Sequence, residues 1–389
     1  MMKTRHIYIV MKEDLVYYPP IISLISILLK LGLEVVCLCI YSDSQGKKVL
    51  TDAGARFVDV GEYDLKGNVI KKFGQLLSYR NKVLGYFRKN TPPRNSYIWI
   101  AQNENVKLFG SLIEKYPTII HQLEFTSPRI SWKYWLMNPF ASIETLYGKA
   151  DKVVCCEYNR AQITRGLYNL KALPYVLPNK TLEPDMDNLD TPADEQRKID
   201  SIIELSKTKK IILYQGVFSS KERRLEEFCQ AFEYLPADYA MVVMGKGSSY
   251  FEELRKKYDS DRIRFIPFIR PPHYLKVTRV AYIGVLSYFP SPSNIGSVIN
   301  PLYCAPNKIF EYARFGIPMI ANDIPGLHYI FQEFKCGLTI PFPMSPRQIS
   351  EGILRISGDY GRYSEGAKEF NRSVDVEKTI SEILESEDS

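Results

Sequence analysis

Two residues one helical turn apart, Lys308 and Glu311, have the side chains needed to bind a phosphorylated ligand. They follow Pro306 and Asn307, which predict the start of a helix, with Asn307 as its cap. The free amides and positive dipole end of a helix attract an anion, to which Lys308 adds a full charge. Glu311 can accept hydrogen bonds from vicinal hydroxyls such as those of a ribose. A capped helix with an ordinary Lys308–Glu311 ion pair is the alternative.

Two glycine-containing turns earlier in the chain add the same kind of chemistry. Each follows a predicted strand, and ligands bind α/β sheets at the carboxyl ends of the strands. Glycine permits close approach of the backbone, and basic residues beside it can neutralise a diphosphate. Such turns are common, so each is a weak signal by itself. The candidate binding residues are Gly216, Lys221, Arg223 and Arg224 in the first turn, and Gly245, Lys246 and Gly247 in the second.

Three other side chains are candidate catalytic residues. Glu13 and Asp14 lie in the predicted loop Met11–Pro20, where either carboxylate could bind hydroxyl groups or act as a general base. Solvated loop charges are the alternative. His121, one of four histidines, follows a predicted strand and is expected either in a ligand cleft or in a structural role.

The stretch from Leu65 to Asn103 contains eight basic residues and no acidic one. Apolar residues interleave with them at roughly helical spacing, which predicts a basic amphipathic helix. Such a helix can lie on an anionic membrane, or can pack its apolar face on the sheet as an ordinary surface helix. Nucleic acid is disfavoured as a partner, since no motif for it accompanies the patch. The candidate membrane-contact residues are Lys71, Lys72, Arg80, Lys82, Arg88 and Lys89, with Lys66 and Arg94 completing the eight.

Two of the three tryptophans, Trp132 and Trp135, lie close together in a segment that also contains Lys133 and Tyr134. Aromatic residues beside Lys suit the headgroup region of a membrane, so both tryptophans are further membrane-contact candidates. A core or domain-interface aromatic cluster is the alternative.

Alternating strands and helices must position these groups. His6–Met11 and Glu34–Ile40 are predicted strands, separated by a helix over Pro20–Leu31, and a second alternation of this kind begins at Lys210. Between the two, Thr181–Asp200 is polar, acidic and interrupted by proline. The sequence therefore predicts an α/β protein with Rossmann-like domains at 1–180 and 209–370, an acidic linker or insert at 181–208, and a helical tail at 371–389 that can cross back to the N-terminal domain.

Composition and spacing exclude several classes of protein. The net charge is +7. The seven cysteines are odd in number and none has zinc-site spacing, so we expect reduced, mostly buried thiols of a cytosolic protein. The N-terminus does not resemble a signal peptide, and charged residues interrupt the apolar stretch Ile21–Ile40. No G-x-G-x-x-G follows the first strand, which argues against a dinucleotide-dependent oxidoreductase. We expect a cytoplasmic protein.

The C-terminal half resembles a known family. From Ile211 to Ile340 the chain is similar to the donor-binding domain of retaining, family 4-like glycosyltransferases of the GT-B fold, in which two Rossmann-like domains face each other across a cleft. The matching pieces are LYQG followed by basic residues, VVMGKG, RIRFIPFI and above all PNKIFEYARFGIPMIANDIPG. In the N-terminal half, KADKVVCCEYNRA, VLPN and HQLEF are compatible but less distinctive.

The resemblance implies roles for individual residues. Glu311 would hold the donor ribose, Lys308 and the backbone at Pro306–Asn307 would lie near the donor sugar and phosphates, and Lys221 with Arg223 would clamp the diphosphate. His121 would lie near the donor sugar. No metal or other cofactor would be needed, since basic residues neutralise the leaving group and no Asp-x-Asp motif is present. The expected donor is a UDP-sugar, and retention at the anomeric carbon is implied by family analogy alone.

One departure from the family pattern leaves alternatives open. The first glutamate of the family's paired motif is replaced by Tyr303. We expect transfer to a lipid-linked or polysaccharide glycan acceptor, as in capsule or exopolysaccharide synthesis, at the inner face of the plasma membrane. A non-catalytic partner subunit of the same fold and a nucleotide-sugar 2-epimerase are the alternatives.

Overall fold

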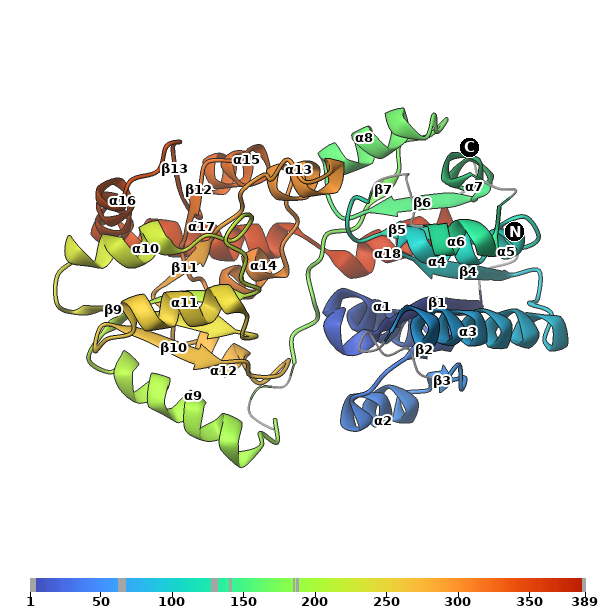
Figure 1. Ribbon diagram of the computed structural model, residues 1–389, viewed down its shortest axis with the longest axis horizontal. Coiled ribbons are helices and arrows are strands. Elements are labelled where there is room, and N and C mark those ends of the chain that lie inside the picture. The colour runs from blue at the N-terminus through green and yellow to red at the C-terminus, as the bar shows by residue number, and fades with distance from the viewer. Residues whose placement is uncertain are drawn as a thin grey trace. The chain divides into compact units, whose positions relative to one another are not determined.

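The computed structural model describes residues 5–61, 68–126, 132–139, 142–184, 186 and 189–386, except the side chains of Val69, Trp132, Lys133 and Met137. The chain forms two compact units (Figure 1). Unit 1 consists of Met1–Asn179 together with Asp375–Ser389, and unit 2 of Lys180–Val374. Each unit is built on one parallel sheet with helices between successive strands, so the predicted α/β fold with two Rossmann-like parts is confirmed.

Unit 1 has a seven-stranded parallel sheet in the order β3-β2-β1-β4-β5-β6-β7. The central strands are near-continuous runs of buried residues, as expected for a sheet covered on both faces. The first strand extends three residues beyond the predicted end at Met11, which places Glu13 and Asp14 on the strand. The strands in spatial order are β3 (Arg56–Phe57), β2 (Glu34–Ile40), β1 (His6–Asp14), β4 (Ser96–Ala101), β5 (Thr118–Gln122), β6 (Lys152–Cys155) and β7 (Tyr175–Val176).

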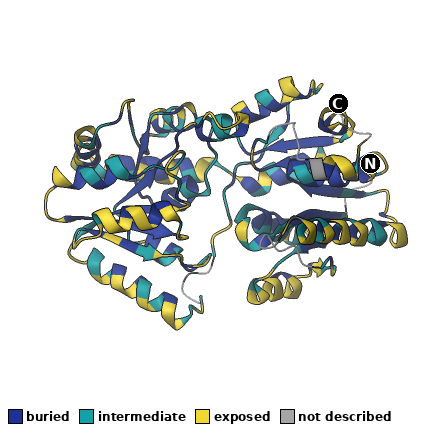
Figure 2. Ribbon diagram, viewed as in Figure 1, coloured by how far each residue is buried: buried dark blue, intermediate teal, exposed yellow. Residues whose placement is uncertain are grey.

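The helices of unit 1 bury the side that faces the sheet and expose the other (Figure 2). They are η1 (Leu15–Tyr17), α1 (Pro19–Lys30), α2 (Ser44–Asp52), α3 (Val69–Lys89), α4 (Asn103–Leu108), α5 (Gly110–Ile113), α6 (Trp132–Met137), α7 (Ile143–Lys149), α8 (Tyr158–Leu167) and α18 (Val376–Glu385).

Helix α18 comes from the far end of the chain and is fixed to unit 1 by a buried lysine. Lys152 Nζ on β6 donates to the carbonyl oxygens of Ile383 (2.7 Å) and Ser386 (2.8 Å). On the exposed side, Lys30 and Glu377 form an ion pair of 2.6 Å. The last helix therefore completes the unit that the first strand begins.

The predicted basic helix exists as α3, and its apolar face is part of the core. Leu76, Tyr79, Val83 and Phe87 are buried at helical spacing, and the Tyr79 hydroxyl donates to the Leu38 carbonyl oxygen (2.9 Å). The buried apolar face is therefore not free to enter a membrane, and the outer face, which carries most of the basic residues, faces solvent.

Unit 2 has a six-stranded parallel sheet in the order β10-β9-β8-β11-β12-β13. The strands are β8 (Lys210–Gly216), β9 (Tyr239–Gly245), β10 (Ile263–Pro267), β11 (Ile283–Leu286), β12 (Met319–Asn322) and β13 (Gly337–Ile340). The helices are α9 (Ala193–Ser206), α10 (Glu226–Gln230), η2 (Ala231–Glu233), α11 (Ser249–Tyr258), α12 (Leu275–Thr278), α13 (Ile295–Leu302), α14 (Asn307–Ala313), α15 (Pro325–Phe334), α16 (Pro346–Gly358) and α17 (Tyr360–Ser373).

The acidic stretch expected as a linker or insert at 181–208 contains α9, which belongs to unit 2. Most of its charged residues face solvent, while Glu195, Ile199 and Ile202 are buried against the unit. Arg270 Nε also donates to Glu195 Oε1 (2.8 Å). Part of the acidic composition therefore belongs to the exposed face of an amphipathic helix.

None of the helices in the described part of the chain is long and apolar enough to cross a membrane. All seven cysteines are buried free thiols. Within the described residues, no group of three His, Cys, Asp or Glu side chains is arranged to hold a metal ion.

Candidate functional site

A cationic pair forms in unit 2 where β8, β11 and α14 meet. Lys308 Nζ lies 4.6 Å from the centroid of the Tyr214 ring and 5.2 Å from that of Tyr288. The Arg223 guanidinium carbon lies 4.1 Å from the same Tyr288 ring. Burial, with the nearby Arg223 charge, lowers the pKa of Lys308 to about 7. Both basic groups lie beside the Tyr288 ring, and a phosphate group placed there would favour the charged form of Lys308.

Glu311 lies one turn after Lys308 on α14 and is almost fully buried. Gln215 Nε2 donates to its Oε2 over 2.6 Å, and the Tyr274 hydroxyl donates to its Oε1. Burial raises the pKa of Glu311, while these two hydrogen bonds oppose that rise. The carboxylate is thus paired with Gln215 and Tyr274, in place of the simple ion pair with Lys308 that the spacing also allowed.

Two glycines let the backbone approach Lys308 closely. Gly216 ends β8 with φ of +136°, a conformation that favours glycine, and it pairs in register with Gly245 at the end of β9. A Cβ atom on Gly245 would lie 1.9 Å from the Gly216 carbonyl oxygen, and one on Gly216 would lie 3.0 Å from Lys308 Nζ. Both glycines are therefore required by geometry at the place where the sequence predicted a binding turn.

The other basic candidates differ in position. The Arg224 guanidinium carbon lies 4.0 Å from the Phe289 ring centroid, and its carbonyl oxygen accepts a hydrogen bond from Ser287 Oγ (2.5 Å). Lys221 and Lys246 are exposed on the two loops, as is Gly247. Of the basic candidates, Arg223 and Lys308 are the two that share the Tyr288 ring.

The start of α14 differs from the prediction. The helix begins at Asn307, so Pro306 holds the cap position and Asn307 does not cap with its side chain. Proline at that position supplies no side-chain oxygen for the first amides. Lys308 and Glu311 keep the predicted one-turn spacing on this seven-residue helix.

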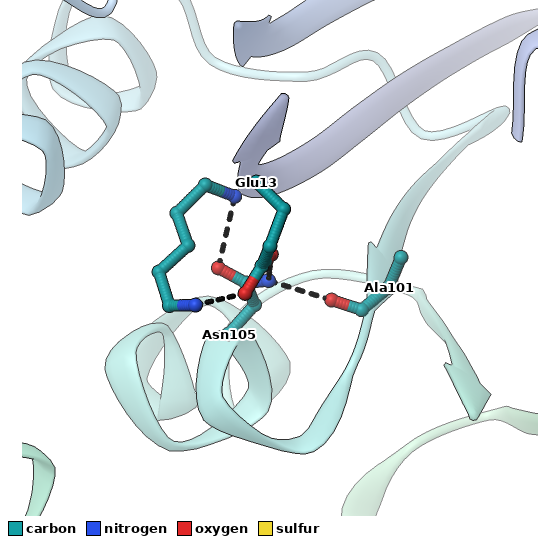
Figure 3. A network of polar contacts seen from close by, with 4 residues as sticks. Glu13, Ala101 and Asn105 are labelled. Carbon is teal, nitrogen blue, oxygen red and sulfur yellow. Dashed lines mark hydrogen bonds and ion pairs between the residues drawn. The ribbon is translucent and has the colours of Figure 1, made fainter. Parts of the chain in front are cut away.

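In unit 1, Glu13 is held in a polar network at the ends of β1 and β4 (Figure 3). Its Oε1 accepts from Lys12 Nζ, and its Oε2 accepts from Asn105 Nδ2 (2.9 Å). Asn105 Nδ2 also donates to the Ala101 carbonyl oxygen (2.7 Å), and Asn105 Oδ1 accepts from the Lys12 amide (3.2 Å). Sequence reasoning missed Asn105 and Lys12, and Glu13 is not the solvated loop charge considered as its alternative.

The Asp14 side chain accepts hydrogen bonds from the nearby backbone. Its Oδ1 accepts hydrogen bonds from the backbone amides of Val16 and Ser42, both at 3.1 Å, and so caps η1 and ties it to the segment after β2. This use of the carboxylate accounts for the residue without a catalytic role.

His121 lies on β5 and is 1% exposed. Its ring meets Trp99 edge-on, with centroids 5.9 Å apart. Burial lowers the pKa of His121 to about 3, so the imidazole is neutral. Within the described residues, neither ring nitrogen has a hydrogen-bond partner. The structure thus places His121 inside unit 1, where it matches neither an open cleft position nor a hydrogen-bonded structural histidine.

Some of the candidate membrane-contact residues are exposed, and others are partly buried. Lys71, Arg88 and Lys89 are exposed, as is Lys82, which lies 3.6 Å from Asp59. Lys72 and Arg80 are partly buried, and Arg80 Nε donates to the Leu108 carbonyl oxygen (3.2 Å). Lys66 and the side chain of Trp132 lie outside the described residues.

Apolar residues are exposed close to these charges in the chain. Trp135 on α6 is 54% exposed, and Leu136 beside it is 52% exposed. On α3, Ile70 is 82% exposed and Leu77 is 40% exposed. Their spacing of seven residues puts Ile70 and Leu77 on one side of the helix. Helices α3 and α6 of unit 1 therefore both present exposed apolar side chains.

The chain was compared with known families and structures. Residues 195–372 match the family model described as glycosyl transferases group 1. No curated protein matches the chain in sequence. HepE of Anabaena, solved with UDP and glucose, superposes with a TM-score of 0.68 at 14% identity, covering 98% of both chains.

Two further solved structures share the fold. A glycosyltransferase of Rickettsia africae superposes with a TM-score of 0.67 at 13% identity, covering 100% of both chains. A putative UDP-N-acetylglucosamine 2-epimerase of Listeria monocytogenes superposes with a TM-score of 0.59 at 12% identity, covering 100% of this chain and 99% of that one. These likenesses concern the fold.

Proposed function

We propose that the chain is a GT-B glycosyltransferase that moves a sugar from a UDP-sugar to a hydroxyl group of a glycan acceptor. The match of residues 195–372 to glycosyl transferases group 1 and the fold shared with HepE support this proposal. The observation that carries the proposal is the joining of a cationic pair, Lys308 and Arg223, to a fixed carboxylate, Glu311, in one unit. Such a set matches the two ends of a nucleoside diphosphate, which offers phosphates and ribose hydroxyls.

In the proposed reaction, Lys308 and Arg223 stabilise the negative charge that grows on the diphosphate as its bond to the sugar breaks. Glu311 accepts hydrogen bonds from the ribose hydroxyls and holds the donor in place. The two cations supply the charge that a metal ion would otherwise supply, so the reaction needs no metal or other cofactor. Retention at the anomeric carbon is proposed on the family resemblance alone.

The acceptor is proposed to be a lipid-linked or polysaccharide glycan, used in the synthesis of a capsule or other surface polysaccharide. The exposed basic side chains of α3 and the exposed Trp135 support contact with an anionic membrane. That contact would bring the protein to the inner face of the plasma membrane. Because the apolar face of α3 is in the core, the contact is by charge and by exposed side chains, without insertion of the helix.

The test is titration calorimetry of the purified protein with UDP, GDP, ADP and dTDP, with NAD and RNA as controls. Preferential binding of UDP, lost in Glu311→Ala while the variant stays folded, is the expected result. Equal affinity of Glu311→Ala and wild type for UDP would remove Glu311 from the site. Binding of none of the nucleotides would favour the non-catalytic partner subunit that the Tyr303 replacement suggests.

A second candidate activity is that of a nucleotide-sugar 2-epimerase. The Listeria protein of the same fold is named as a putative enzyme of this kind. The two reactions differ in their products. Incubation with UDP-N-acetylglucosamine and no acceptor gives the 2-epimer only in an epimerase, whereas a transferase releases UDP and free sugar slowly. Proton NMR of the mixture separates these outcomes.

A further inference from the structure

A chain of hydrogen bonds from three elements surrounds Glu311. Gln215 at the end of β8 donates from Nε2 to Glu311 Oε2 (2.6 Å), and Tyr274, which precedes α12, donates its hydroxyl to Oε1. Thr278, the last residue of α12, donates from Oγ1 to Gln215 Oε1 (2.7 Å). Helix α12 packs against α14, which carries Glu311. Neither Tyr274 nor Thr278 belongs to the motif that identified the site.

Chemistry fixes the direction of this chain. An ionised carboxylate can only accept, so Gln215 must turn its NH₂ group toward Glu311. Its amide oxygen then faces Thr278, whose hydroxyl must donate. Gln215 and Thr278 are 3% and 0% exposed, so water offers little competition for these bonds. The Gln215 amide is therefore held in one orientation from both of its ends.

The result is a carboxylate whose two oxygens each keep some capacity to accept a further hydrogen bond. Each oxygen can accept about two hydrogen bonds, and each already accepts one from the protein. The remaining capacity can take two hydroxyl donors on neighbouring atoms, provided that the carboxylate does not rotate. Fixing it before the ligand arrives removes the cost of ordering it on binding.

We propose that Tyr274, Gln215 and Thr278 are positioning residues that hold the Glu311 carboxylate for both ribose hydroxyls, and that they set a preference for ribonucleotides over deoxyribonucleotides. The inference rests on the proposed function, in which Glu311 binds the donor ribose. It adds residues that act through Glu311 and do not themselves touch the nucleotide.

The charge state of Glu311 supports the same assignment. Burial raises the pKa of Glu311, and the hydrogen bonds from Tyr274 and Gln215 act against burial. Loss of the Tyr274 hydroxyl should therefore raise the pKa further. A protonated carboxyl has fewer acceptor positions for the ribose, so acidification should weaken nucleotide binding at a higher pH in Tyr274→Phe than in the wild type.

The test compares UDP, 2′-deoxy-UDP and 3′-deoxy-UDP by titration calorimetry in the wild type, Tyr274→Phe and Thr278→Val. The wild type should prefer UDP over both deoxy ligands. Tyr274→Phe should reduce that preference about tenfold, the size expected for losing a hydrogen bond to a charged group. Thr278→Val keeps the side-chain shape and should reduce it less. Tyr239→Phe is the matched control, since its hydroxyl bonds to Ser357 Oγ (2.8 Å) in the same unit.

The outcomes separate the two proposals. If the wild type binds UDP and both deoxy ligands equally well, Glu311 does not hold the ribose, and the donor site of the proposed function fails together with this inference. If the wild type prefers UDP while Tyr274→Phe and Thr278→Val keep both that preference and the wild-type pH profile, the donor site stands and the positioning role is overturned. An equal loss of the preference for UDP in the control Tyr239→Phe would also overturn the positioning role.

Discussion

Lys308 Nζ lies 4.6 Å from the centroid of the Tyr214 ring, and this site lowers the pKa of Lys308 to about 7. In the free protein, the amine therefore loses its proton at a much lower pH than an exposed lysine does. A bound diphosphate favours the charged form and raises the pKa again. Lys308 thus couples anion binding to a proton.

The first prediction is that UDP binding takes up protons at pH 8, approaching one per site. Affinity should then fall as pH rises above about 7, because the free protein must be protonated to bind. Calorimetry at pH 8 in buffers of different ionisation enthalpy measures the uptake. Lys308→Met should bind more weakly and take up no proton. Wild-type binding that takes up no proton at pH 8 would contradict this role.

The second prediction concerns the glycine pair. Gly245→Ala should lower the free energy of unfolding by about 1–3 kcal/mol, because its Cβ would lie 1.9 Å from the Gly216 carbonyl oxygen. It should also weaken UDP binding, since the Gly216 turn lies against Lys308. Gly247→Ala is the control, because a Cβ there meets no atom within 4 Å. Urea unfolding measures the free energy of unfolding of both variants, and calorimetry measures their binding of UDP. Equal stability of the two variants would refute the close approach of Gly245 to Gly216.

The third prediction tests the outer face of α3. Replacing Lys71, Lys72, Arg88 and Lys89 with Gln should weaken sedimentation with anionic vesicles at least tenfold, given about 1 kcal/mol per basic residue near a charged surface. The same change at Arg255, Lys256 and Lys257, in the last turn of α11, is the control. If the substitutions on α3 and on α11 weaken vesicle binding equally, the net charge of the protein and not the outer face of α3 is responsible.

The fourth prediction concerns the exposed tryptophan. Trp135→Ser should weaken vesicle binding and leave the free energy of unfolding within about 0.5 kcal/mol, because the side chain is 54% exposed. Tyr158→Ser on α8 removes a similarly exposed aromatic residue (55%) from the same unit as a control. Marked destabilisation by Trp135→Ser would instead assign this residue to packing.

The parts of the site that sequence could identify are local in the chain. Lys308 and Glu311 share one short helix, and Gly216 with Arg223 lies in one turn after a strand, so residue type and spacing were sufficient. The fold class followed in the same way from the alternation of apolar runs with helices. The structure adds that Lys308 and Arg223 share the Tyr288 ring.

The parts that sequence missed come together from separate elements. Tyr274 and Gln215 lie 37 and 96 residues from Glu311 in the chain, and nothing in their neighbourhoods marks them as partners of a carboxylate. Asn105 meets Glu13 in the same way over 92 residues. The periodicity of α3 predicted an apolar face but could not tell whether it met a sheet or a membrane. Tertiary packing decides each of these.

The attachment of α18 to unit 1 has a consequence for synthesis of the protein. Unit 2 is continuous in sequence from Lys180 to Val374, whereas unit 1 needs Asp375–Ser389 from the end of the chain. On the ribosome, unit 2 can therefore be complete while unit 1 still lacks a helix, and Lys152 meets the carbonyl oxygens of Ile383 and Ser386 only after α18 has been made. The usual order, in which the N-terminal domain is finished first, is reversed.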